Sequence, residues 1–236
     1  YLDIVTGGFR NRELRIFRGG PDGYDLEHPD KIVLGPNPEG YEPPVPKTEA
    51  EIPSLFSGDS ELYNEFGEVR FLFAADFNND GWLDLFVSQI VGPYCYILWG
   101  GPEGFGTERM SRLCTDGVAS ANAADLDGDG WLDLVLGGHM SKGKKSIYES
   151  YITVYWGGPD GFSENRKMQL PASCANSVAI GDFNGDGVLD IYATAYNNGR
   201  NRDIMSYLYY GQKGGVYSVN HHKLLFNHSG SGCVAG

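Results

Sequence analysis

The chain of 236 residues is 41% hydrophobic and 13% aromatic, so it has enough apolar side chains to form a folded core, in one large domain or two small ones. Its 31 acidic and 18 basic side chains give a formal net charge of −13, which disfavours nucleic acid or an anionic membrane as the main partner. No apolar run is long enough for a membrane-spanning helix, and residues 1–30 contain no secretory apolar region.

The first part of the chain predicts short strands followed by an insertion. Residues 1–8 and 16–24 read YLDIVTGG and IFRGGPDGY, which are apolar runs ending in glycine-rich turns. Residues 35–63 contain six prolines, which exclude a regular strand pair, and we expect either a binding loop or a tolerated surface excursion there.

The next elements repeat. Residues 73–87, 122–136 and 178–192 read FAADFNNDGWLDLFV, NAADLDGDGWLDLVL and VAIGDFNGDGVLDIY, which are three copies of one module. A second signature follows each copy, at 97–105 and 154–162, and in a weaker form at 208–217. A fixed order of two signatures at this spacing indicates a repeat architecture.

Each repeat predicts about four short β-strands and no amphipathic helix. The aspartates that close the modules are separated by 49 and 57 residues, a length that suits one blade of a β-propeller. We therefore predict an all-β chain, 1–236, that forms a single propeller domain or a fragment of one. Its predicted repeat units are about 1–70 with the insertion at 35–63, then 71–119, 120–177 and 178–236.

Both ends of the chain fall inside a repeat. Asp3 occupies the place of a module's closing aspartate, and residues 231–236 resemble the strand that precedes each module. The expectation is a piece of a longer repeat array, and Asp3 is not counted as a site because its loop partners are missing.

The acidic loop of each module predicts a calcium site. We number its positions 1 to 9 and name the loops A (76–84), B (125–133) and C (182–190). Loop B places carboxylates at positions 1, 3, 5 and 9, which would repel one another without a cation. Calcium prefers six to eight oxygen ligands, whereas softer metals prefer His or Cys.

Fifteen ligands are predicted for three Ca²⁺ ions, with the residue at position 7 contributing its main-chain carbonyl. Loops A and C have Asn at position 3 and so carry one carboxylate fewer than loop B, which we expect to bind most tightly. The predicted ligands are Asp76, Asn78, Asp80, Trp82 and Asp84 in loop A; Asp125, Asp127, Asp129, Trp131 and Asp133 in loop B; and Asp182, Asn184, Asp186, Val188 and Asp190 in loop C.

With these loops and their flanking strands, the chain resembles the FG-GAP repeat, also called the VCBS-type repeat, of integrin α subunits and many bacterial surface proteins. The resemblance implies a calcium-stabilised propeller, usually of seven blades, that recognises ligands on a face of the ring. This chain has only four units, so either residues outside it complete the ring or four blades close on themselves.

The function expected from these features is non-catalytic. We predict a calcium-stabilised extracellular or cell-surface propeller for adhesion, or for binding a protein or glycan. One alternative is a structural subunit of a surface fibre or sheet, in which copies of the chain contact one another. Another is a carbohydrate-binding propeller or accessory domain of a polysaccharide-degrading enzyme, with Tyr94, Tyr196 and Tyr209 as candidates for stacking on sugars.

Other reactive residues give weaker signals. The cysteines, at 95, 114, 174 and 233, lack CxxC spacing, so they predict either two disulfides or buried thiols rather than a zinc site. His221, His222 and His228 predict a surface strand and loop rather than a metal or catalytic site. The lysines within 139–150 predict a solvated hairpin tip.

Overall fold

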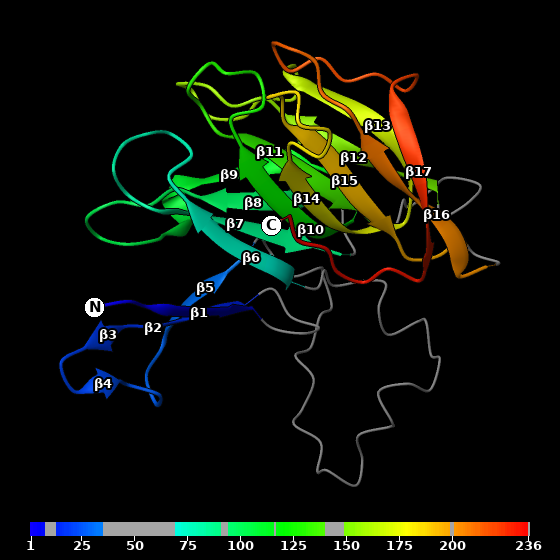
Figure 1. Ribbon diagram of the computed structural model, residues 1–236. Helices are drawn as coiled ribbons and strands as arrows, with labels where there is room; N and C mark the ends of the chain where they lie inside the picture. Colours follow the sequence, from blue (N-terminus) through cyan, green and yellow to red (C-terminus); the bar gives the residue numbers. More distant parts are fainter. Residues whose placement is uncertain are drawn as a thin grey trace, which may run out of the picture.

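A computed structural model shows that the chain folds almost entirely into antiparallel β-sheets (Figure 1). The structure describes residues 1–7, 13–34, 69–90, 94–115, 117–139, 149–198 and 201–235. The one helical element in that part of the chain is a short 3-10 turn, η3 (Thr107–Arg109), so the predicted all-β class is confirmed. None of these residues belongs to a helix long and apolar enough to cross a membrane.

Three sheets have four strands each, hydrogen-bonded in chain order. The second sheet contains β6 (Val69–Ala75), β7 (Asp84–Gln89), β8 (Tyr94–Leu98) and β9 (Met110–Cys114). The third contains β10 (Val118–Ala124), β11 (Asp133–Gly138), β12 (Glu149–Tyr155) and β13 (Lys167–Ser173). The fourth contains β14 (Ala175–Gly181), β15 (Asp190–Ala195), β16 (Asp203–Tyr209) and β17 (His222–His228). This is the strand order of propeller blades.

The first sheet is smaller. It contains β1 (Ile4–Gly7), β2 (Glu13–Phe17) and β5 (Asp30–Val33), and a two-residue ribbon of β3 (Gly19–Gly20) and β4 (Gly23–Tyr24) lies between β2 and β5 in the chain. The predicted insertion at 35–63 and the lysines of the predicted hairpin tip within 139–150 lie outside the described residues. The division of the chain into units at 71, 120 and 178 stays a prediction.

The second strands of the second and third sheets, β7 and β11, are buried on both faces, whereas Tyr192 of β15 is partly exposed. In β7, Leu85 and Val87 pack toward the first sheet, whereas Phe86 packs toward the third. Successive side chains of a strand point to opposite faces, so a strand sandwiched between two neighbours must be apolar throughout. The LDLFV, LDLVL and LDIYA runs of the sequence meet this requirement.

The sheets therefore stack face to face, with one hydrophobic cluster between each neighbouring pair. Their first strands lie next to one another in chain order, since β6 contacts both β1 and β10, and β10 contacts β14 (Figure 1). Each first strand of the three larger sheets also has a register shift near its start, at residues 69–72, 118–120 and 175–177. Identical irregularities at equivalent places support structural equivalence of the repeats.

The last described residues run beside β14. The amide of Cys233 donates to Ser177 Oγ over 3.2 Å, and Asn176 Nδ2 donates to the carbonyl of Ser231 over 3.2 Å. The sequence predicts a strand-like segment here, and the structure places it along the first strand of the fourth sheet as irregular chain.

Replacing Tyr155 with phenylalanine is expected to lower the free energy of unfolding by about 1 kcal/mol. The Tyr155 hydroxyl lies between the second and third sheets, where it donates to the carbonyl of Cys114 over 2.8 Å. Tyr192→Phe is the matched control, because the Tyr192 hydroxyl has no hydrogen bond within the described ranges. Urea unfolding of both variants measures the difference, and equal midpoints would argue against this link between the sheets.

Candidate metal centre

The acidic loops join the first strand to the second strand of each four-stranded sheet. Loop A connects β6 to β7, loop B connects β10 to β11, and loop C connects β14 to β15. Antiparallel pairing brings the turn between the third and fourth strands to the same end of each sheet. The loops and the glycine-rich turns therefore share one side of the molecule.

The aspartate at position 1 organises the middle of its loop. In loop B, Asp125 Oδ1 accepts the amide of Asp129 over 3.1 Å, and Asp125 Oδ2 accepts the amide of Gly130 over 3.0 Å. The same two contacts recur at Asp76 in loop A and at Asp182 in loop C. Hydrogen bonds from backbone amides, led by the one from Gly187, hold the pKa of Asp182 below its ordinary value.

The loops turn tightly because two positions have left-handed backbone. Position 6 is Gly in all three, with φ between 82° and 92°. Position 4 is Gly128 and Gly185 in loops B and C, whereas loop A uses Asn79 at φ 53°. Asparagine tolerates this region better than other residues with a side chain, so loop A keeps the same turn.

The aspartate at position 9 is the buried member of each loop. Asp84, Asp133 and Asp190 are all 0% exposed. Asp133 Oδ2 accepts the amide of Leu126 at loop position 2, and Asp133 Oδ1 accepts the amide of Gly157 in the following turn, both over 2.8 Å. Asp84 and Asp190 make the equivalent pairs of contacts. Position 9 therefore ties the acidic loop to the glycine-rich turn.

Asp3 makes part of the same arrangement in the first sheet. Its Oδ1 accepts the amide of Gly19 over 2.9 Å, which is the equivalent turn contact. Its Oδ2 accepts from Arg18 over 2.9 Å, where the other sheets use an amide of the loop. The assignment of Asp3 to the closing position thus agrees with its contacts.

Loop B brings three carboxylates together. One oxygen each of Asp125, Asp127 and Asp133 lies within 4.8 Å of the other two. Hard oxygen donors at this spacing fit a divalent cation such as calcium. Burial raises the pKa of Asp133 to about 6, because the charged form loses hydration, and a bound cation would favour that charged form. This cluster can hold a metal ion.

The other predicted ligands are less closely gathered. Asp129 is exposed and lies outside the cluster, and its Oδ1 accepts the amide of Trp131 over 2.9 Å. Elsewhere in the described residues, no other group of three acidic, His or Cys side chains meets the same spacing. In loops A and C, the side-chain Nδ2 of Asn78 or Asn184 donates to the carboxylate of the position-5 aspartate over 2.9 Å. The carbonyl ligands at position 7 remain predictions.

Sequence reasoning missed the residues that hold the glycine-rich turns. An added Cβ at Gly157 would overlap the carbonyl oxygen of Leu132. Gly100 and Gly211 meet the equivalent carbonyl oxygens, those of Leu83 and Leu189. An arginine nine residues after the turn glycine caps the turn, since Arg109 Nη1 donates to the carbonyl of Gly100 over 2.8 Å, and Arg166 donates to that of Gly157. The shared nine-residue spacing was the available signal.

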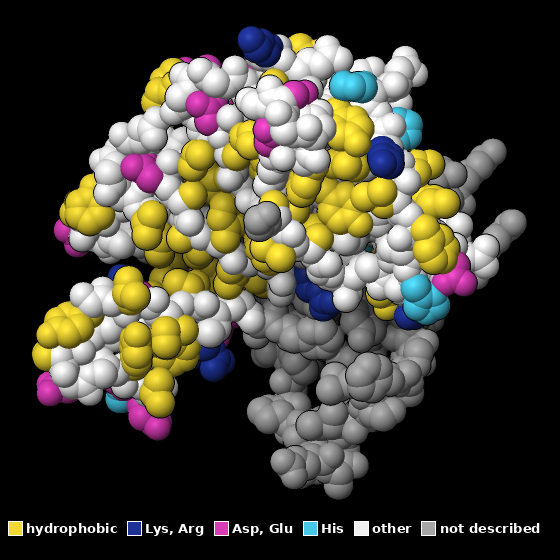
Figure 2. Space-filling model, in the orientation of Figure 1, with side chains coloured by type: hydrophobic (Ala, Val, Ile, Leu, Met, Phe, Trp, Pro, Cys, Tyr) yellow, Lys and Arg dark blue, Asp and Glu magenta, His cyan; other side chains and the backbone are white. Residues whose placement is uncertain are grey.

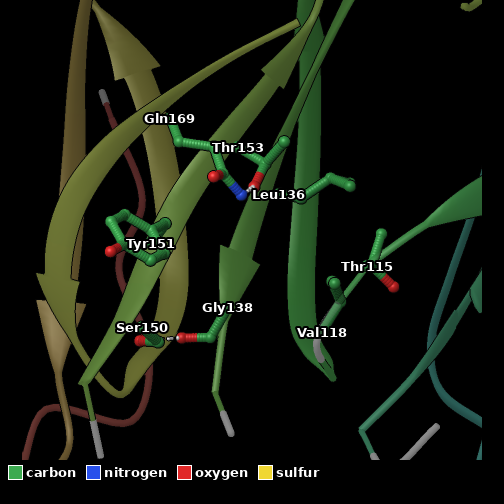
Figure 3. A pocket seen from close by; sticks show the side chains of 8 residues that line it. All are labelled: Thr115, Val118, Leu136, Gly138, Ser150, Tyr151, Thr153 and Gln169. Atoms are coloured by element: carbon green, nitrogen blue, oxygen red, sulfur yellow. Dashed lines mark hydrogen bonds between the residues drawn. The ribbon is translucent and has the colours of Figure 1, made fainter. Parts of the chain in front are cut away.

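A small pocket lies where the second and third sheets meet (Figure 3). Gln169 Nε2 donates to Thr153 Oγ1 over 3.3 Å, and Ser150 Oγ donates to the carbonyl of Gly138. The lining is uncharged and offers no acid–base pair. The residues that line it are Thr115, Val118, Leu136, Gly138, Ser150, Tyr151, Thr153 and Gln169.

The remaining candidates are resolved by burial. Tyr209 is 1% exposed and donates its hydroxyl to the carbonyl of Pro171, so its suggested role in stacking on sugars is wrong. Tyr94 and Tyr196 are half-buried. The three histidines are exposed, as a surface strand and loop require: His222 and His228 are the end residues of β17, and His221 precedes it. All four cysteines are free thiols, and Cys95 and Cys174 are buried.

Comparisons with known proteins agree with the repeat assignment. Residues 76–136 and 144–193 match the FG-GAP-like repeat, and residues 175–219 match the FG-GAP repeat. The chain belongs to the FG-GAP repeat proteins, as its modules predict. A comparison with curated proteins gave no match.

One solved structure with a similar chain is a crystal structure of BBS1N in complex with ARL6DN, soaked with lead. The sequence identity is 12% and the TM-score is 0.34, over 91% of this chain and 62% of that chain. The chain therefore spans less than two thirds of the length of that relative.

Proposed function

We propose that the chain is a non-catalytic, calcium-stabilised propeller module that works outside the cell in adhesion or in binding a protein or glycan. The observation that carries the proposal is the oxygen cluster of Asp125, Asp127 and Asp133, set in a loop whose hydrogen bonds recur in loops A and C. FG-GAP membership supports a binding role rather than a catalytic one.

The proposal places one Ca²⁺ in each acidic loop. The loops have equivalent backbone hydrogen bonds, so a ligand set that forms in loop B has counterparts in loops A and C. Three divalent ions would offset six negative charges of the acidic chain. Extracellular calcium is abundant, so even weak sites would be filled there, and metal binding would add directly to folding stability.

Equilibrium dialysis with calcium should give three ions per chain. Asp125→Asn, Asp76→Asn and Asp182→Asn should each reduce the number by one, because each removes the position-1 carboxylate of one loop. Asp160→Asn in a turn is the control and should leave three. A wild-type value of two or fewer would contradict the three-site assignment.

Loop B should bind calcium most tightly. Asp127→Asn makes its ligand set equal to those of loops A and C, so we expect its affinity to fall by roughly an order of magnitude. Asn184→Asp should raise the affinity of loop C in return. Isothermal titration calorimetry measures both, and an unchanged binding profile in the two variants would show that the position-3 charge does not set affinity.

The binding role has its own test. Beads coated with extracellular matrix proteins or glycans are passed over immobilised chain in millimolar calcium, then in chelator. Calcium-dependent retention of one coating is expected. Retention of none, by a chain shown to be folded and calcium-loaded, would contradict adhesion but leave the metal sites standing.

A further inference from the structure

The outermost strand of the fourth sheet, β17, has one free edge. All seven of its residues pair with β16, and no second strand pairs with it among the parts of the chain that the structure describes. The free edge of such a strand carries unpaired amides and carbonyls, which can pair with another chain. Figure 1 places β17 at the rim of the molecule.

The outer strands of the other two four-stranded sheets have features that block pairing. β13 contains Pro171, which removes one amide donor. The last amide of β9, that of Cys114, already donates to Glu164 over 2.8 Å. The sequence of β17, HKLLFNH, contains neither proline nor an acidic residue.

The free edge also exposes apolar side chains. Phe226 is 68% exposed, Leu224 is 46% exposed, and Met205 beside them on β16 is 45% exposed. Figure 2 shows hydrophobic side chains along this rim with histidines above and below them. A continuous exposed apolar strip on a sheet edge is typical of an interaction surface.

The residue pattern of β17 is nearly symmetric about Leu225. In an antiparallel pair of two β17 strands centred there, Leu224 faces Phe226, Lys223 faces Asn227, and His222 faces His228. In this register, odd-numbered residues face odd-numbered residues and even-numbered residues face even-numbered ones. The backbone amides and carbonyls of alternate residues point to the same edge of a strand, so the groups at the free edge of one β17 meet those at the free edge of the other. The apolar side chains of both strands also fall on the same face.

We propose that β17 pairs antiparallel with β17 of a second copy of this chain, about a two-fold axis at Leu225. The two fourth sheets then form one eight-stranded sheet, and the contact is isologous, as in most symmetric dimers. The two-fold axis produces two cross-strand pairs of Leu224 with Phe226, and each aliphatic–aromatic pair stabilises the contact. The contact depends on the fold of the fourth sheet and not on calcium-dependent adhesion.

Sedimentation velocity tests the association. A single strand pair is a small interface, so we expect a weak dimer with a dissociation constant on the order of 10–100 µM. Phe226→Glu and Leu224→Glu should each remove the dimer, because each places a charge opposite an apolar side chain of the other copy and brings two like charges to diagonal positions. Val216→Glu is the control, since this apolar residue is about as exposed as Leu224 but lies outside β17. A wild-type chain that stays monomeric well above this concentration range would overturn the proposal.

Cross-linking tests the register. Leu225→Cys should form a covalent dimer under mild oxidation, because the two residues lie directly opposite one another within disulfide reach. Lys223→Cys should not, because its two copies lie about four residues apart along the strands. The wild-type chain controls for its own exposed Cys114. If Leu225→Cys cross-links no more than wild type or Lys223→Cys, the proposed pairing is wrong.

Discussion

Replacing Asp133 with alanine is expected to lower the free energy of unfolding by about 3–5 kcal/mol in saturating calcium. The carboxylate is fully buried, and it accepts the amides of Leu126 and Gly157. Alanine leaves both amides without an acceptor and removes a predicted metal ligand. Urea unfolding monitored by tryptophan fluorescence measures the loss.

Asp160→Ala is the control for this variant, because Asp160 is an exposed aspartate in the turn that Asp133 holds. It should change the free energy of unfolding by less than about 0.5 kcal/mol. In chelator the Asp133 variant should still be the less stable of the two, since the amides lose their acceptor with or without metal. Equal stability of the two variants would contradict the proposed role of position 9.

Gly157→Ala is expected to lower the free energy of unfolding by about 2–3 kcal/mol. The added methyl group would overlap the backbone carbonyl of Leu132, which is fixed by the start of β11. The loop or the turn must therefore shift, which weakens the contact between Asp133 and the Gly157 amide. Calorimetric melting of the variant measures the effect.

The neighbouring glycine provides a matched control. An added Cβ at Gly158 would meet only the guanidinium of Arg166, and this flexible side chain can move away. Gly158→Ala should therefore cost clearly less than Gly157→Ala. If the two variants have the same melting temperature, the close approach of Gly157 to the carbonyl of Leu132 does not limit stability.

Much of the fold was predictable because the repeat signals the same local structure several times. The LDLFV, LDLVL and LDIYA runs fix the buried second strands, and Asp-Gly and Gly-Gly-Pro fix the turns around them. The cluster of Asp125, Asp127 and Asp133 was predictable for the same reason, since alternate acidic residues can converge when the chain turns at position 6. The other loop ligands stay predictions.

The contacts between repeats were harder to predict. The hydroxyl of Tyr155 meets the carbonyl of Cys114 across 41 residues, and the hydroxyl of Tyr209 meets that of Pro171 across 38. Such pairs depend on how sheets stack, which strand periodicity does not specify. Tyr209 follows the same alternation as any strand aromatic, so its burial became clear only once the neighbouring sheet was placed.

Thermal unfolding with and without calcium tests the central claim, that the acidic loops bind calcium and thereby stabilise the fold. At about 100 times the dissociation constant, each site adds about 2.7 kcal/mol. Three sites should then raise the melting temperature by roughly 15–30 °C relative to the chelated protein. Melting curves that superimpose in millimolar calcium and in excess chelator would contradict the account.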